Sequence, residues 1–310
     1  WYCNMVVVRL PEDGCLVYSP VLGPDSSIES VQAEFAKYNL LPVRVVVVPT
    51  PQHHLAIAEY QRLFPEAFYV CGKASGQMQS LTKKRRDLRF DGKLRPPGRV
   101  CDGVSINSSL DKTQDSINLF PIMEPSEIPL SAHHPSGGGY EELLAVWSEL
   151  ASSSENNANS IFDVCILDDN RTGEIVLLHK PSKTLIVSDL LYKSCRDIVG
   201  PGGVSHNYSA PEWFAKGQDE LFYDPRMNIE NASVMDSGEA NERPRTEPSV
   251  RPLLPSYRTH PKARTIDTAG LKISLERILA WDFKRCLACH TDPIAGDEAR
   301  KLIKQAWGFV

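Results

Sequence analysis

The sequence predicts an α/β protein with two blocks of strands and helices. Short apolar runs rich in valine, isoleucine and leucine alternate with longer stretches whose apolar residues recur at helical spacing. Hydrophobic residues make up 42% of the 310 residues and charged residues 24%, which is typical of a globular protein with a substantial core. Alternation of strand and helix favours layered packing of helices against sheets.

The first block occupies the N-terminal third of the chain. Its first two strands are joined by a Pro-Glu-Asp-Gly turn. Ser26 is expected to begin the next helix, because Glu29 three residues later completes a capping-box pattern. The predicted elements are strands at Met5–Leu10 and Cys15–Tyr18, a helix over 26–38, a strand at Val43–Val48, a helix from about His54 to Phe64 and a strand at Ala67–Cys71.

The middle of the chain is less regular. Residues 74–135 contain the basic run Lys83–Arg86, which we interpret as a solvated loop rather than a nucleic-acid contact. Tyr140–Ala151 is predicted to be a helix because its leucines and Trp147 fall on one side. The Ser/Asn-rich stretch 152–160 is typical of a linker or surface loop.

The second block begins after this linker. Residues 197–268, rich in proline, glycine, asparagine, serine and glutamate, interrupt it and show little periodicity. The predicted elements are strands at Ile161–Leu167, Glu174–His179 and Lys183–Ser188, a helix at Leu271–Ala280, a strand at Lys284–Cys289 and a helix at Ala295–Trp307.

Charge and composition exclude several classes of protein. The net charge of −5 argues against a general nucleic-acid binder, and no apolar run is long enough to span a membrane. Several of the eight cysteines lie in apolar runs, which favours buried thiols in an intracellular reducing compartment, cytoplasmic or organellar, over a disulfide framework. The first residue is Trp1 rather than methionine, which suggests a trimmed or processed start.

Three strand ends carry side chains of the types that bind metals. His53 and His54 follow the valine-rich strand, Asp189 follows Lys183–Ser188, and His290 follows Lys284–Cys289. Polar residues at the point where a buried strand emerges are poised to face a shared cleft. Two or three histidines with one carboxylate form a common ligand set for zinc or iron.

The order of these motifs resembles the metallo-β-lactamase superfamily, and more narrowly an uncharacterised branch of it. The matching features are Met5–Leu10, Ser19-Pro20, His53-His54, the segment His179–Val187 and Asp189. The resemblance implies a four-layer αββα sandwich formed by a single domain over 1–310, with long loop insertions at about 100–135 and 200–265.

The departures from the superfamily pattern are equally informative. In the first motif, His-X-His-X-Asp-His, the two leading histidines fall on Pro49 and Pro51, which cannot bind metal. The histidine of the third motif falls on Glu174. The resemblance therefore implies at most one metal ion, zinc or iron, in a site formed by His53, His54, Asp189 and His290.

Two functions are compatible with this ligand set. The first is metal-assisted hydrolysis of a small-molecule ester, lactone, thioester or phosphoester, in which Asp189 ligates and orients the water and Glu174 is a distant ligand or a base. Lys73 or His179 would balance substrate charge. The second is a catalytically inactive member of the fold that serves as a structural or assembly subunit and binds protein partners through its insertions.

Each candidate residue also has an ordinary structural interpretation. The histidine pair is compatible with a helix start, Asp189 with a turn or helix cap, and Glu174 with a solvent-facing strand position. The run Cys286–His290 has the Cys-X-X-Cys-His pattern of covalent haem attachment. Its place in an apolar run between two predicted helices argues against haem. A Cys-X-X-Cys zinc or redox pair is a further possibility, but a strand would place Cys286 and Cys289 on opposite faces, which argues against it.

Overall fold

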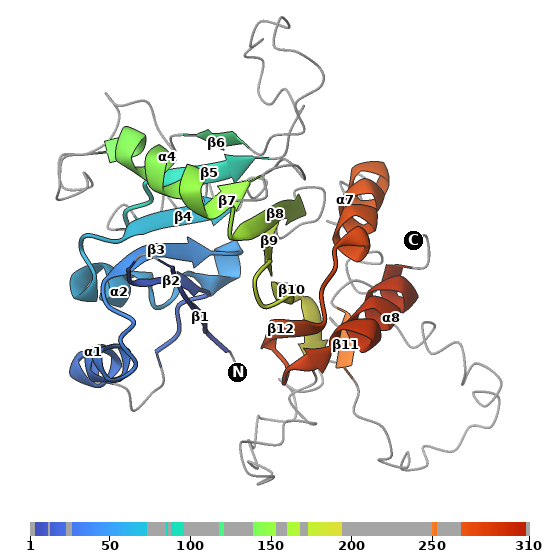
Figure 1. Cartoon of the computed structure of the whole chain (residues 1–310), viewed down its shortest axis with the longest axis horizontal. Helices are drawn as coiled ribbons and strands as arrows, with labels where there is room; N and C mark the ends of the chain where they lie inside the picture. Colours follow the sequence, from blue (N-terminus) through green and yellow to red (C-terminus); the bar gives the residue numbers. More distant parts are fainter. Residues whose placement is uncertain are drawn as a thin grey trace, which may run out of the picture.

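The computed structural model describes most of both blocks. The residues described are 4–11, 13–22, 27–72, 85, 88–95, 118–120, 139–152, 160–167, 173–193, 250–252 and 268–307. Within them the chain is a mixed α/β protein with two mixed sheets and five α-helices (Figure 1). The predicted α/β class is confirmed.

The first sheet comes from the N-terminal part of the chain, and its six strands follow one another in sequence order. They are β1 (Val6–Arg9), β2 (Cys15–Tyr18), β3 (Val43–Val48), β4 (Phe68–Gly72), β5 (Gly92–Arg95) and β6 (Asn118–Phe120). The central pairs from β2 to β5 are parallel, whereas β1 and β6 pair antiparallel at the edges. The crossovers that parallel strands require include the helices α1 (Ile28–Lys37) and α2 (Ile57–Leu63).

The second sheet has the order β13-β12-β10-β9-β8-β7, with β11 paired to β10. Its strands are β7 (Ala151–Ser152), β8 (Phe162–Leu167), β9 (Glu174–His179), β10 (Thr184–Lys193), β11 (Val250–Pro252), β12 (Arg285–His290) and β13 (Ile294–Ala295). β8, β9 and β10 form an antiparallel meander, and β12 lies parallel to β10. The helix α7 (Thr268–Ala280) connects the second sheet to β12, and α8 (Gly296–Trp307) follows β13.

The two sheets face each other across a shared core. Alternate residues of one strand point to opposite faces, so Val45 and Val47 of β3 enter the core between the sheets together with Leu177 and Ile186. The helix α4 (Gly139–Leu150) closes one end of this core with residues that include Trp147. Because both faces of β3 are buried, its sequence is a nearly unbroken run of valines.

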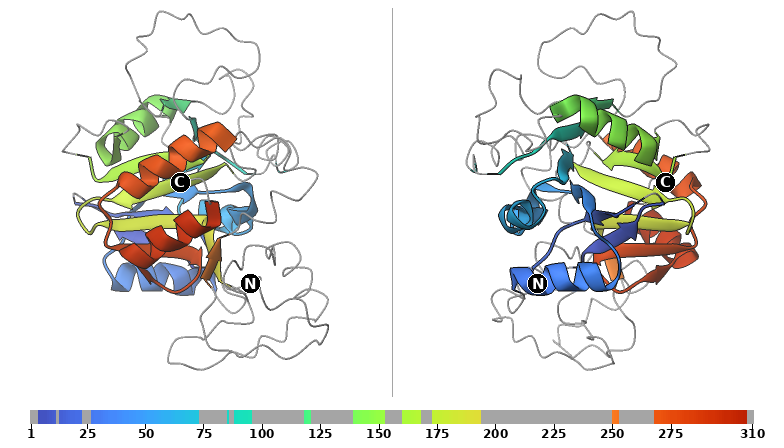
Figure 2. Two further views of the ribbon diagram at one scale, coloured as in Figure 1. Left: turned by 90° about the vertical axis from the view of Figure 1, so that its right-hand side faces the viewer. Right: turned by 60° about the vertical axis from the view of Figure 1, so that its left-hand side comes forward.

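Helices cover the outer faces of both sheets. On the first sheet, Val46 and Val48 pack with Phe35 of α1 and Tyr60 of α2. On the second sheet, the outer faces of β9, β10 and β12 pack with α7 and α8. Figures 1 and 2 show α1 and α2 on one outer side of the sheets and α7 and α8 on the other.

Several predicted boundaries are wrong in ways that matter for the site. The helix expected from His54 begins at Ile57, and a separate 3-10 turn, η1 (Pro51–His54), precedes it. The strand expected to end at Ser188 continues to Lys193. The N-cap of α1 is Ser27, whose hydroxyl accepts a hydrogen bond from the backbone N–H of Ser30.

The structure describes only parts of the irregular regions. The expected linker 152–160 begins with Ser152 in β7, and its residues 153–159 lie outside the described residues. Most of the expected insertions, at about 100–135 and 200–265, and the basic run except Arg85 also lie outside them. The short strands β6 and β11 belong to these insertions and were not predicted. Among the described residues, no helix combines the length and the apolar character needed to cross a membrane.

Candidate metal centre

His53 reaches the space between the sheets from the turn that follows β3. Pro51 starts the 3-10 turn with a fixed φ angle, and His53 departs from helical geometry with φ −90° and ψ 37°. Its backbone N–H donates to the carbonyl of Thr50 at 3.1 Å. The turn therefore directs the His53 imidazole inward, where its side chain is buried.

Asp189 reaches the same space from an irregularity within β10. The parallel register pairs Val187 with Ala288 and then Tyr192 with His290, so β10 contains three more residues than β12 over this interval. Such bulges break the ladder and redirect side chains, often next to functional sites. Asp189 was predicted to follow a strand end, and the structure instead places it inside the bulged part of the strand.

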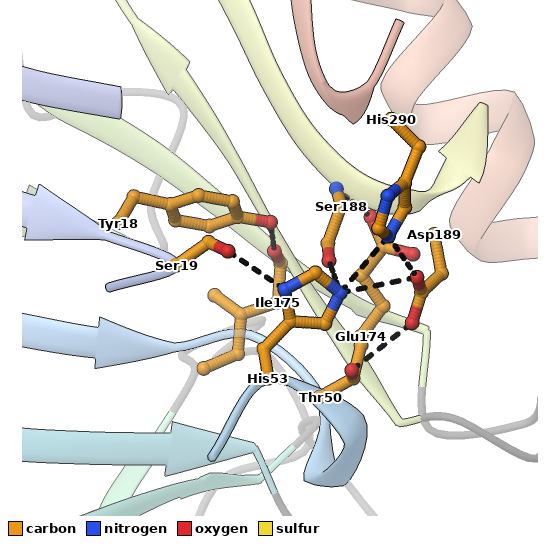
Figure 3. A network of polar contacts seen from close by, with 9 residues as sticks. All are labelled: Tyr18, Ser19, Thr50, His53, Glu174, Ile175, Ser188, Asp189 and His290. Carbon is orange, nitrogen blue, oxygen red and sulfur yellow. Dashed lines mark hydrogen bonds and ion pairs between the residues drawn. The ribbon is translucent and has the colours of Figure 1, made fainter. Parts of the chain in front are cut away.

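Three donor atoms meet at this point. The Nε2 atoms of His53 and His290 are 3.2 Å apart, and each lies close to Oδ1 of Asp189, at 3.2 Å and 3.1 Å respectively (Figure 3). The three residues form the only group among the described residues that has three potential metal-binding side chains in mutual reach. His53 comes from the first sheet, and Asp189 and His290 from the second.

The electrostatics of the cluster favour an ionised Asp189. Burial acts to raise the pKa of this carboxyl, but electrostatic attraction to His53 and His290 and the close contacts of both imidazoles outweigh burial. The pKa of Asp189 therefore lies well below its ordinary value. An anionic carboxylate next to two imidazole nitrogens is a donor set that suits a divalent cation.

Hydroxyl groups fix the orientation of two of the donors. The Ser19 hydroxyl lies 2.7 Å from Nδ1 of His53, on the side of the ring away from the cluster. The Thr50 hydroxyl donates to Oδ2 of Asp189 at 3.0 Å, which leaves Oδ1 facing the histidines. A third hydroxyl, that of Ser188, lies 2.9 Å from Nε2 of His53.

Glu174 lies beside the cluster but is not one of its three members. It is fully buried, and its Oε1 accepts a 2.6 Å hydrogen bond from the backbone N–H of Ser188. Its Oε2 is buried without a hydrogen-bond partner. Burial, reinforced by the carboxylate of Asp189, raises the pKa of Glu174 to about 8. The interpretation of Glu174 as a solvent-facing strand residue is therefore wrong.

Hydrogen bonds also join the two sheets close to the site. The Tyr18 hydroxyl donates to the carbonyl of Ile175 at 2.6 Å, and the Ile175 N–H donates to the carbonyl of Pro49 at 3.1 Å. At the other side of the cluster, the Asn4 backbone N–H donates to the carbonyl of Cys289 at 2.6 Å. These contacts hold the ends of β2, β3, β9 and β12 in a fixed relation around the donors.

Other residues singled out in the sequence do not join this cluster. His54 is half-buried and is not a member of the three-residue group. His179 lies at the opposite end of β9 from Glu174, where its Nδ1 is 2.6 Å from the Ser182 hydroxyl. Lys73 lies outside the described residues.

The Cys-X-X-Cys-His run is divided between two cores. Cys286 packs between the second sheet and its helices, whereas Cys289 packs between the two sheets. They therefore lie on opposite faces of β12, as strand geometry predicts. Both belong to the five described cysteines, all of which are buried, and this separation leaves no surface that offers both sulfurs to one haem.

A scan against models of known protein families and a search among curated proteins both find no match for the chain.

The hydroxyl groups were not predicted as parts of the site. Ser19 directly follows β2, Thr50 lies two residues beyond the end of β3, and Ser188 lies within β10 after a run of apolar residues. Each is completely buried, and a small polar side chain at such a position requires a partner in the protein. That pattern was visible in the sequence as a weak signal for a polar network, although the partners were not.

Proposed function

We propose that the chain is a hydrolase that uses a single divalent metal ion, zinc or iron, bound by His53, Asp189 and His290. The observation that carries the proposal is the spacing of their donor atoms, which lie 3.1–3.2 Å from one another. Tetrahedral donors around a zinc ion, at ligand distances of about 2.0–2.1 Å, lie about 3.3 Å apart. Two imidazole nitrogens and a carboxylate oxygen also form a common ligand set for zinc and iron.

The chemistry of such a site is hydrolysis. A divalent ion held there would lower the pKa of a water molecule and polarise the carbonyl or phosphoryl oxygen of an ester, lactone, thioester or phosphoester. Asp189 contributes negative charge, and Thr50 holds its second oxygen. Glu174 acts as a positioning residue, since its carboxyl binds the backbone N–H of Ser188 next to Asp189 rather than facing the donor triangle.

The proposal extends to the fold. We assign the chain to the metallo-β-lactamase-like αββα sandwiches, in a form with one metal ion. Support comes from two mixed sheets that share a core and carry helices on their outer faces. Further support comes from a cluster assembled at the ends of strands from both sheets. Pro49 and Pro51 stand at the positions of the two leading histidines of the superfamily's first motif, which agrees with the loss of that first metal site.

A second candidate function is favoured by the burial of the donors. The exposed fractions of His53, Asp189 and His290 are between 5% and 8%. Such burial suits an ion with a structural role, which would hold together the two sheets of a non-catalytic subunit. The metal ligands are the same in both functions, and the two differ in whether a substrate reaches the ion.

The first experiment measures metal content by elemental analysis in the purified wild type and in His290→Ala. The matched control is His54→Ala, because His54 neighbours His53 in the sequence but lies outside the donor triangle. We expect about one zinc or iron per chain in the wild type and in His54→Ala, and a large loss in His290→Ala. No metal in the wild type after reconstitution would refute both functions.

The second experiment separates the two functions. The reconstituted wild type is assayed against chromogenic esters, a lactone, a thioester and a phosphodiester, with His290→Ala as the blank. Turnover that depends on His290 and is retained in His54→Ala supports the hydrolase. Stoichiometric metal without turnover of any of these substrates would reject the hydrolase in favour of the structural ion.

A further inference from the structure

Ser19 is unusual in its backbone conformation as well as in its contacts. It follows the last residue of β2 and has a φ angle of +57°, in the left-handed region that few residues other than glycine adopt. Its N–H donates to the carbonyl of Val47 at 2.9 Å, which ties this conformation to the neighbouring strand. Glycine would adopt this backbone more easily, so the serine side chain requires its own explanation.

The Ser19 hydroxyl provides that explanation. It lies 2.7 Å from Nδ1 of His53, whereas Nε2 of the same ring faces Asp189, His290 and the Ser188 hydroxyl. A neutral imidazole carries one proton, and the partner of one nitrogen determines which nitrogen is left to bind a metal. If Nδ1–H donates to Ser19, Nε2 is the unprotonated nitrogen and its lone pair faces the cluster.

A nucleophilic role for Ser19 is less compatible with the structure. Ser19, His53 and Asp189 stand in the order of a Ser–His–Asp triad, with contacts of 2.7 Å and 3.2 Å. The Ser19 side chain is completely buried, however, and a nucleophile must be reached by its substrate. Burial suits a hydroxyl whose partner is another side chain.

We propose that Ser19 is a positioning residue that selects the Nδ1-protonated tautomer of His53 and so presents Nε2 to the metal. The inference rests on the metal site of the proposed function and adds a determinant of its affinity. Partners of metal-bound histidines typically change metal affinity 10- to 100-fold when they are removed. We expect a loss in this range when the Ser19 hydroxyl is removed.

The test compares Ser19→Gly and Ser19→Ala with the wild type. Both variants lack the hydroxyl, but glycine accepts the left-handed backbone and alanine does not. The control is Ser160→Ala, which removes another buried hydroxyl, one that accepts a 2.6 Å hydrogen bond from Lys180 Nζ. Zinc affinity is measured by competition with a chromophoric chelator, and the tautomer of His53 by ¹⁵N NMR of the zinc-loaded protein.

We expect zinc affinity to fall about 10- to 100-fold in both Ser19 variants and to stay within about twofold in Ser160→Ala. The metal-free Ser19→Gly protein should unfold near the wild-type temperature, since the backbone strain is relieved. The NMR spectrum should change from one His53 tautomer to a mixture. A purely structural role would lower the unfolding temperature and leave the tautomer unchanged. Should one Ser19 variant not fold, the other gives the same readouts.

Two failures are distinguishable. A wild-type chain that binds no zinc overturns the proposed function and this inference with it. A wild-type chain that binds zinc no more tightly than Ser19→Gly, with an unchanged His53 tautomer, overturns the inference alone.

Discussion

The fold opposes the negative charge of the buried Glu174 carboxyl group. Burial raises its pKa from 4.5 to about 8, with a further contribution from Asp189. Hydrogen bonds from the backbone N–H groups of Ser188 and Asp189 and the charge of His53 act in the opposite direction but are weaker. Replacing Glu174 with glutamine keeps the shape and the acceptor for Ser188 N–H and removes the titration.

The sign of the effect follows from the two pKa values. Between pH 4.5 and about 8 the folded protein keeps the Glu174 proton that the unfolded chain has already released. The folded state then binds more protons, so its stability falls as pH rises through this window. The slope approaches about 1.4 kcal/mol per pH unit, and the whole window corresponds to about 4–5 kcal/mol.

The assay is urea unfolding of the metal-free wild type and Glu174→Gln at intervals from pH 5 to pH 8. A chelator is present, because a bound cation would favour the ionised carboxylate. We expect the glutamine variant to gain stability relative to the wild type as pH rises, by several kcal/mol at pH 8. Glu298→Gln, at an exposed position on α8, is the control and should follow the wild type. Parallel stability curves for Glu174→Gln and the wild type would refute the reasoning.

Three further predictions concern the metal and the contact between the sheets. A chelator should lower the unfolding temperature of the metal-loaded wild type but not that of His290→Ala, since free zinc at 100 times its dissociation constant adds about 2.7 kcal/mol of stability. Equal changes in the unfolding temperatures of the two proteins would contradict the assignment of His290 as a ligand. Tyr18→Phe, which removes the 2.6 Å hydrogen bond to the Ile175 carbonyl, should cost about 1–2 kcal/mol in urea unfolding, and an unchanged midpoint would show that this bond adds nothing. Gly72→Ala would place a Cβ atom 2.4 Å from the carbonyl oxygen of Gly173, so we expect a destabilisation of about 1–3 kcal/mol. A variant as stable as the wild type would contradict the close approach of the two sheets at Gly72.

Regular elements were predictable because their signals are local. The continuous apolar run of β3 and the helical spacing of α4 and α8 depend only on neighbouring residues. Short strands such as β5, β6 and β11 were missed because segments of three or four residues carry little periodicity of their own.

The candidate site was predictable in its chemistry but only in part in its geometry. The sequence drew attention to histidines and a carboxylate near strand ends, and His53, Asp189 and His290 lie together in the structure. It could not distinguish His53 from His54, because the choice depends on the non-helical backbone of a 3-10 turn. It also did not reveal the bulge in β10, which is defined only by pairing with a strand about a hundred residues away.

The assembly of the donor triangle from distant segments has a consequence for biosynthesis. His53 and His290 are 237 residues apart in the chain. At synthesis rates of about 5–20 residues per second, a ribosome needs roughly 12–50 s to travel between them. During that interval the nascent chain carries one imidazole of the pair without the other. The donor triangle on which the proposed function rests is therefore complete only after β12 has been synthesised and the two sheets have come together.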